Sequence, residues 1–182
     1  AAKARGLPVT CAVSAHHLVL NELDVGSYLT FRKVRPPLRS EADRTAMVEG
    51  VASGAIDAIV SSHEPQGADT KRQPYASAAA GTVGLETLLG ASLSLVHEGH
   101  ASLMHVLGTL TAMPARIFGL PTGRLAKGAP ADLVLIDEGD PYAVDADTLH
   151  SRAHNTAFEG RKFQGRALQT FVGGECVFER NR

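Results

Sequence analysis

A short apolar run that leads into a polar loop is the first candidate for chemistry in this chain. The segment DAIVSSHEPQ covers residues 57–66, and its first four residues are expected to form a buried strand. The loop that follows holds His63 and Glu64. Because catalytic groups in α/β enzymes often follow directly after strand ends, residues 61–66 are a candidate active-site loop.

Five other histidines are possible metal ligands by residue type. His16 and His17 resemble a ligand pair, but neighbours on an extended segment face opposite ways. We therefore expect one of them to be packed or hydrogen-bonded and the other to be solvated. His97, His100 and His105 are scattered over predicted helices and a loop, where we expect surface or helix-end positions. None of the five is predicted to bind a metal.

The composition indicates an ordinary globular protein. Of the 182 residues, 44% are hydrophobic and 20% are charged, and the formal net charge of −1 gives no reason to expect nucleic acid or a membrane as a partner. A basic cluster could attract an anion, but we expect it to be a solvated or interfacial loop; it consists of Arg32, Lys33, Arg35 and Arg39.

The spacing of the two cysteines and the length of the apolar runs bear on where in the cell the protein is located. Cys11 and Cys176 lie far apart and lack CxxC spacing, which favours a reducing, cytoplasmic location. No apolar run approaches the roughly 18 residues that a membrane helix needs.

Strands and helices alternate around the candidate loop. Residues 1–5 read as the last turn of a helix, and residues 8–15 as a strand. Irregular chain is expected over 16–40, where two consecutive prolines forbid regular structure. A helix is predicted over 40–54, capped by Ser40 and stopped by Gly54, with Met47 and Val51 on one face.

Further helices and then a β unit follow. A helix is predicted over 84–99, with one apolar side made of Leu85, Leu88, Leu89, Ser92 and Val96. Residues 102–120 hold one or two more helices, with Ser102 as a cap and Pro114 as the start of the second. From about residue 121 onward the pattern changes to strands with glycine turns, including a hairpin through Gly173 and Gly174.

This order predicts two domains, residues 1–120 and residues 121–182. The first is expected to be α/β with parallel strands. Two βα units cannot bury both faces of a parallel sheet or close a barrel, so we expect strands to be missing on the N-terminal side or supplied by another chain. A chain that begins at the end of a helix also suggests a piece of a longer protein.

Several motifs, taken in order, resemble those of the dihydroorotases, members of the amidohydrolase superfamily. KVRPPLRSEADRTAMVEGVASGAIDAIVSSHEPQ, residues 33–66, resembles a family pattern of KxNPPLR, a helix ending in EGxxxGxID, and a strand ending in DHAPH. SAHHL resembles the family's TPHHL, and GTVGLETLL resembles its GIVGxET. GRLAKGAPADLVLID and NTAFEGRKFQGRALQTFVGGECV resemble its segments after the barrel. The resemblance covers nearly the whole chain.

The resemblance implies a (β/α)8 barrel with a small β-sandwich assembled from both chain ends. This chain would supply the last two βα units and the C-terminal part of the sandwich. Active sites of such barrels lie at the C-terminal ends of the strands, which is where residues 61–66 would fall.

Hydrolysis of a cyclic amide needs a strong nucleophile and a polarised carbonyl, which zinc supplies in the family. The resemblance implies that an aspartate after the last strand binds metal and shuttles a proton, while the other metal ligands come from strands that this chain does not contain. No zinc ligand is therefore expected in this chain.

The family's functional positions are altered here. The resemblance places the aspartate at Ser62, the substrate-binding histidine at Gln66 and the substrate-binding asparagine at Arg35. A serine hydroxyl is neutral at pH 7 and replaces neither a zinc-binding nor a proton-accepting carboxylate. Backbone contacts to substrate would fall on Ala80 and Gly81. Glu64 and Asp69 lie nearby in sequence, but we do not expect either to compensate.

Three hypotheses follow. The first is a catalytically degenerate dihydroorotase-like protein that serves as a structural partner of aspartate carbamoyltransferase in pyrimidine biosynthesis. The second is an active zinc-dependent cyclic amidohydrolase that opens dihydroorotate to N-carbamoyl-aspartate and is completed by an N-terminal half of the barrel. The third is a standalone binding domain, which the ordered motifs disfavour. We also expect a homo-oligomer.

Overall fold

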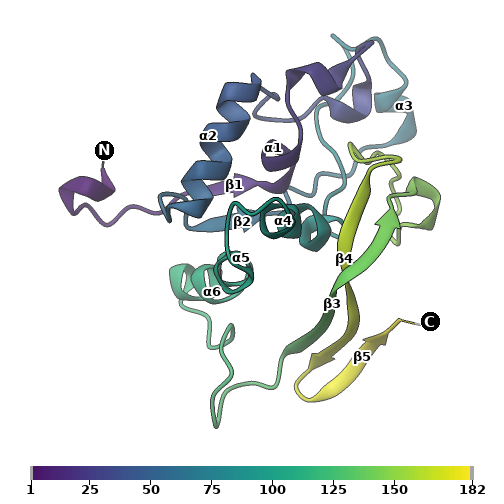
Figure 1. Cartoon of the computed structure of the whole chain (residues 1–182). Helices are drawn as coiled ribbons and strands as arrows, with labels where there is room; N and C mark the ends of the chain where they lie inside the picture. Colours follow the sequence, from purple (N-terminus) through teal and green to yellow (C-terminus); the bar gives the residue numbers. More distant parts are fainter. Residues whose placement is uncertain (1, 181–182) are drawn as a thin grey trace.

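The computed structural model describes residues 2–180, and it contains two separate sheets (Figure 1). The short strands β1 (Ala12–Ser14) and β2 (Ala58–Val60) pair in parallel. The strands β3 (Leu133–Ala143), β4 (Lys162–Val172) and β5 (Glu175–Glu179) form an antiparallel sheet. The predicted mixed α/β fold with parallel strands is therefore confirmed, while the domain boundary at residues 120 and 121 stays a prediction.

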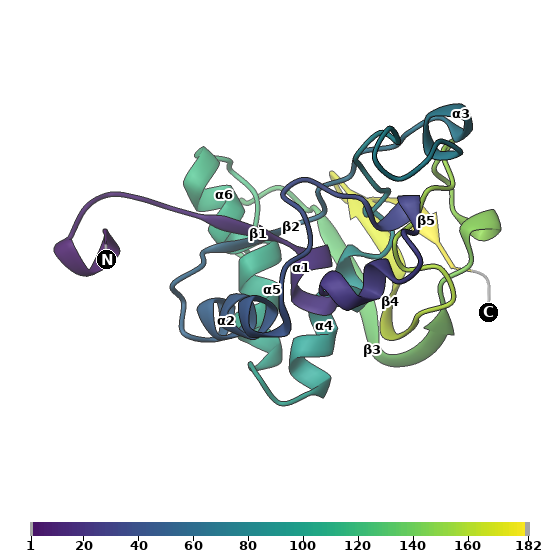
Figure 2. The same cartoon turned by 90° about the horizontal axis from the view of Figure 1, so that it is seen from above.

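Helices separate the two sheets along the chain. The first two, α1 (Ala15–Val19) and α2 (Glu41–Ala52), lie between β1 and β2 in sequence. The others follow β2 and are α3 (Ala68–Lys71), α4 (Leu88–His97), α5 (Leu103–Leu110) and α6 (Ala112–Phe118). Seen from above, α4 lies between the parallel strands and the long antiparallel hairpin (Figure 2), and it contacts both α1 and β4. Within residues 2–180, no helix has the length and apolar character that crossing a membrane requires.

The helix caps and the hairpin turn that the sequence predicts are present in the structure. Ser40 and Asp43 form a capping box, in which the Ser40 hydroxyl accepts from the Asp43 amide and the Asp43 carboxylate accepts from the Ser40 amide. Ser102 caps α5 by accepting from the His105 amide. The hairpin turn at 173–174 is also confirmed, and both glycines have positive φ angles of 59° and 89°.

Predictions of which helix face is buried were less accurate. In α2 the buried residues are Val48 and Val51, whereas Met47 is 37% exposed. In α4 the predicted apolar side is correct for Ser92 and in part for Leu88 and Val96, which pack partly buried against the core. It misses other buried residues because this helix packs between α1 and β4 and so is covered on two sides. Its buried residues are Gly90, Ala91, Ser92, Leu93 and Leu95, and Leu85 precedes the helix.

Element boundaries also differ from the predictions near both ends of residues 1–120. The predicted strand 8–15 is shorter, because Ser14 caps a helix that begins at Ala15. The predicted helix end at 1–5 is a 3-10 turn, Lys3–Arg5, followed by Gly6 with φ 73°. The last helix starts at Ala112, two residues before Pro114.

Candidate active site

The loop after β2 runs beside a second extended segment. His63 forms an isolated parallel bridge with Thr82, and the Glu64 amide donates to the Thr82 carbonyl at 2.8 Å. Ser62 is exposed and adopts a left-handed conformation with φ 43°. The two segments therefore hold residues 61–66 in one place, at the C-terminal end of β2.

His63 serves to anchor this loop. Its Nδ1 accepts from the Gly84 amide at 3.2 Å and from the Leu85 amide at 3.4 Å. An acceptor Nδ1 carries no proton and has its lone pair engaged, so Nδ1 is not free to bind a metal.

Gln66 and Gly81 are brought together by a residue that sequence analysis did not single out. The Asn155 side-chain oxygen accepts from the backbone amide of Gln66 at 3.1 Å, and the Asn155 Nδ2 donates to the Gly81 carbonyl at 3.1 Å. Asn155 is 2% exposed, so both bonds are shielded from water. A side chain at Gly81 would lie 2.9 Å from the Gln66 Nε2, and φ there is 127°. Glycine is required at this position.

Arg35 is not drawn into this arrangement. It is exposed, and it makes no hydrogen bond or ion pair with any residue of the described part. Its neighbour Lys33 does approach the site, because the Gly81 amide donates to the Lys33 carbonyl at 2.8 Å. Ala80, the other predicted backbone contact, is buried. The structure thus groups Gln66, Ala80 and Gly81, and leaves the Arg35 side chain in solvent.

The basic cluster was expected to be a solvated or interfacial loop, and its members divide between the two: Arg32 and Lys33 contact neighbouring loops, whereas Arg35 and Arg39 are exposed. The Arg32 Nε donates to the Ala157 carbonyl at 3.1 Å. The Lys33 ammonium donates to the carbonyls of Tyr75 and Ala76 at 2.7 and 2.9 Å, and it lies 5.4 Å from the centre of the Tyr75 ring. These bonds tie the 32–33 segment to neighbouring loops rather than offering a site for an anion.

A buried lysine lies under the loop and was not anticipated. Lys71 is 2% exposed, and its ammonium donates to the carbonyls of Thr30 and Ala79 at 2.9 and 2.8 Å. Burial lowers the pKa of Lys71 to about 8, and the nearby Glu64 carboxylate opposes this change. Lys71 lies in a polar stretch of sequence, which predicts an exposed side chain, so its burial becomes evident only from its hydrogen bonds in the structure.

The side chains of His16 and His17 have separate hydrogen-bond partners. His16 is 1% exposed; its Nδ1 bonds the Ser14 hydroxyl at 2.9 Å and its ring stacks on Phe158 at 5.0 Å. The His17 Nε2 bonds the Pro36 carbonyl at 3.0 Å. The expected split into a packed and a more exposed histidine is correct, but its reason was wrong, because both residues lie on the helix α1.

The surface histidines match the expectation with one exception. His97 and His100 are exposed, whereas His105 is half-buried and its Nε2 bonds the Val51 carbonyl at 2.7 Å. Across residues 2–180, no group of three or more His, Cys, Asp or Glu side chains is placed to hold a metal ion. The donors of the loop are a neutral Ser62 hydroxyl, an engaged His63 Nδ1 and the Glu64 carboxylate, which do not fit a zinc ion by themselves.

The model of the amidohydrolase family matches residues 3–177, and the chain belongs to this family. It is 46% identical to the dihydroorotase of Anaplasma phagocytophilum (strain HZ) and 46% identical to that of Anaeromyxobacter sp. (strain K). These alignments cover 98% and 100% of this chain but 40% and 42% of the two relatives, so the chain spans about two fifths of their length.

Solved structures support the same fold. L-Hydantoinase (dihydropyrimidinase) from Arthrobacter aurescens matches with a TM-score of 0.93 at 29% identity, over 100% of this chain and 42% of that one. D-Hydantoinase (dihydropyrimidinase) from Thermus sp. matches with a TM-score of 0.89 at 24% identity, over 98% of this chain and 41% of that one, which shows the shared fold alone.

Proposed function

We propose that this chain is part of a dihydroorotase-like protein of pyrimidine biosynthesis that has lost hydrolytic activity and acts as a structural partner of aspartate carbamoyltransferase. The observation that carries the proposal is the residue at the end of β2, where Ser62 presents a hydroxyl. The resemblance to catalytically degenerate dihydroorotases supports the partner role. The exposed, unpaired Cys11 and Cys176 fit a reducing, cytoplasmic compartment.

The same proposal places the chain within a barrel. β1 and β2, with the helices that follow them, are the last two βα units of a (β/α)8 barrel, and β3 to β5 are part of a β-sandwich. The parallel pairing of β1 with β2 supports the first assignment. The separate antiparallel sheet supports the second.

The family's carboxylate is charged near pH 7, whereas the Ser62 hydroxyl is neutral. In the family, bound zinc supplies the hydroxide that attacks the ring, and a carboxylate after the last strand relays the proton. A serine hydroxyl is neutral near pH 7 and accepts no proton from an attacking water. Gln66, which Asn155 holds beside Gly81, is an amide and does not titrate. Ser62 and Gln66 can bind and orient a ligand, but neither side chain can relay a proton near pH 7.

The test uses the full-length protein. Zinc content and dihydroorotate turnover are measured for the wild type and for the double variant Ser62→Asp, Gln66→His. We expect neither stoichiometric zinc nor turnover in the wild type, together with co-elution with aspartate carbamoyltransferase in size-exclusion chromatography. Stoichiometric zinc with measurable wild-type turnover would refute the loss of activity, and separate elution would refute the partner role.

An active zinc-dependent dihydroorotase is the second candidate, favoured by one contact. The Glu64 carboxylate lies beside Gly81, where an added Cβ would be 2.9 Å from its Cδ. If Glu64 has taken over the missing carboxylate's role, Glu64→Gln abolishes turnover, whereas Ser62→Asp changes it only modestly.

A further inference from the structure

Lys71 connects two chain segments that meet at the candidate site. Its ammonium donates to the Thr30 carbonyl at 2.9 Å and to the Ala79 carbonyl at 2.8 Å. Each of these contacts is accompanied by a second bond. The Thr30 hydroxyl donates to the Lys71 carbonyl at 2.7 Å, and the Ala79 amide donates to the Thr70 carbonyl at 3.1 Å. Residues 70–71 are therefore joined by two bonds to each of the segments that contain Thr30 and Ala79.

The Lys71 ammonium makes both contacts away from water. Lys71 is 2% exposed, and burial lowers its pKa to about 8, so the amine is still mostly protonated at pH 7. The Glu64 carboxylate raises this pKa and the Lys33 ammonium lowers it. Hydrogen bonds from an ionised donor are stronger than those between neutral groups, and a buried carbonyl that loses its donor costs free energy. The junction of the three segments thus depends on one charged side chain.

Lys33 holds the tip of the same loop. Its ammonium donates to the carbonyls of Tyr75 and Ala76 at 2.7 and 2.9 Å. Its own carbonyl accepts from the Gly81 amide at 2.8 Å, and the Gly81 carbonyl accepts from the Asn155 Nδ2 at 3.1 Å. The backbone of residue 81 is therefore bonded through both its amide and its carbonyl.

Ala80 lies between two residues whose backbones are held. Ala79 is bonded through its amide to Thr70 and through its carbonyl to Lys71, and Gly81 is bonded on both sides as well. Because peptide units are planar and of fixed length, holding the residues on either side leaves little freedom to the residue between them. The position of the Ala80 backbone is thus set by its neighbours' partners.

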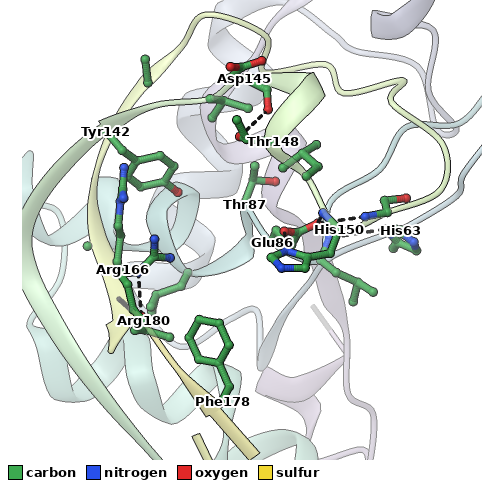
Figure 3. Close-up of a pocket in the computed structure, with 18 residues that line it drawn as sticks. His63, Glu86, Thr87, Tyr142, Asp145, Thr148, His150, Arg166, Phe178 and Arg180 are labelled. Carbon is green, nitrogen blue, oxygen red and sulfur yellow. Dashed lines mark hydrogen bonds and ion pairs between the residues drawn. The ribbon is translucent and has the colours of Figure 1, made fainter. Parts of the chain in front are cut away.

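The chain after this segment is held by different contacts. The His63 Nδ1 accepts from the two amides at residues 84–85, and Figure 3 shows His63 and Glu86 at the wall of a cavity. Neither Lys71 nor residues 79–81 line this cavity. The bonds of Lys71 and those of His63 therefore hold separate parts of the site.

We propose that Lys71 is a positioning residue of the candidate site: its ammonium closes the loop formed by residues 71–79 and so fixes the backbone of Ala80 and Gly81, where the family resemblance places contacts to a ligand. Lys71 acts through the Ala79 carbonyl and contacts no ligand itself. The inference rests on the proposed function only for what the site contacts, since the positioning is the same whether or not hydrolysis has been lost.

Hydrogen–deuterium exchange of the full-length protein, followed by mass spectrometry, tests this role. Lys71→Met keeps the length of the side chain but removes its charge and donors. We expect residues 77–82 to exchange about tenfold faster in this variant, because loss of a charge-assisted bond makes local opening easier. Residues 88–97 of α4 should exchange as in the wild type. Arg72→Met removes the same charge from the exposed neighbouring position and should leave both regions unchanged.

A conservative variant separates positioning from general stability. Lys71→Arg keeps the charge and the donors, and we expect it to return exchange of residues 77–82 to within about threefold of the wild type. Four outcomes would overturn the proposal. They are wild-type exchange of residues 77–82 in Lys71→Met, equal acceleration in Arg72→Met, equal acceleration of residues 88–97, and no rescue by Lys71→Arg.

A second variant covers the case in which Lys71→Met does not fold. Thr30→Val removes the hydroxyl that donates to the Lys71 carbonyl and leaves the ammonium in place. Faster exchange of residues 77–82 in this variant supports the junction, and unchanged exchange contradicts it. Zinc content and turnover test the proposed function separately, so either conclusion can fail while the other stands.

Discussion

Replacement of His16 should change how the stability of the protein depends on pH. This ring is 1% exposed, and burial, followed by the charge of His17, lowers its pKa from 6.5 to about 4. The Val83 backbone opposes this change to a small extent. Since the unfolded chain binds the proton near pH 6.5 and the folded chain only near pH 4, unfolding takes up a proton between these values. Stability is complete above pH 6.5 and is lost as the pH falls toward 4.

The size of the effect follows from the two pKa values. They differ by about 2.5 pH units, and each unit corresponds to about 1.4 kcal/mol, so His16 alone removes about 3 kcal/mol of unfolding free energy by pH 4. That is a large share of the roughly 5–15 kcal/mol that stabilises a typical domain. The His16→Gln variant loses the stack on Phe158 and is less stable at neutral pH, but it does not titrate.

Urea unfolding of the full-length protein at several pH values between 7.5 and 4.5 measures this. The stability gap between wild type and His16→Gln should narrow steadily as the pH falls, with most of the change below pH 6. His100→Gln removes an exposed histidine and is the matched control. Parallel loss of stability in wild type and His16→Gln over this range would show that His16 does not carry the effect, and the reasoning from its burial would be wrong.

Three further substitutions test a buried hydrogen bond at the site, the packing of β4 on α4 and the cap of α2, each by urea unfolding at pH 7.5. Asn155→Ala should cost about 2 kcal/mol or more, because it leaves the buried carbonyl of Gly81 without its donor; a cost below about 0.5 kcal/mol would contradict this role. Gly165→Ala should cost at least about 2 kcal/mol, since φ is 107° and the new Cβ would overlap Leu93; a neutral result would mean that Leu93 moves aside freely. Ser40→Ala should cost about 1 kcal/mol through loss of the cap on α2, and a cost as large as that of Asn155→Ala would be unexpected at so exposed a position.

Local signals in the sequence predicted the elements well. Ser40, Ser102 and the glycines at 173–174 each specify a cap or a turn through contacts within a few residues, and the structure has all three features. The buried side of α4 was predicted only in part, because it depends on two neighbours, α1 and β4, that are distant in sequence. A single apolar stripe describes a helix covered on one side, whereas α4 is covered on two.

The candidate site likewise contains some residues that the sequence identifies and others that only the structure identifies. Ser62 and Gln66 were assigned through the resemblance to the DHAPH motif, and both follow a strand that the sequence predicts. Asn155 and Lys71 could not be assigned, because their roles arise from hydrogen bonds to residues 74–89 and 8–41 positions away. A buried amide or ammonium gives no periodic signal, since it needs only one well-placed partner for each polar group.

The backbone at position 62 bears on why the carboxylate is absent. Ser62 has φ 43°, a left-handed conformation that Asp and Asn adopt more readily than most residues. An aspartate there would therefore suit the local conformation at least as well as the serine, and the exposed side chain has room for it. The fold therefore does not require a hydroxyl at this position. Ser62→Asp should accordingly leave the unfolding free energy unchanged or slightly raised, which makes any turnover gained by that variant a direct measure of the missing charge.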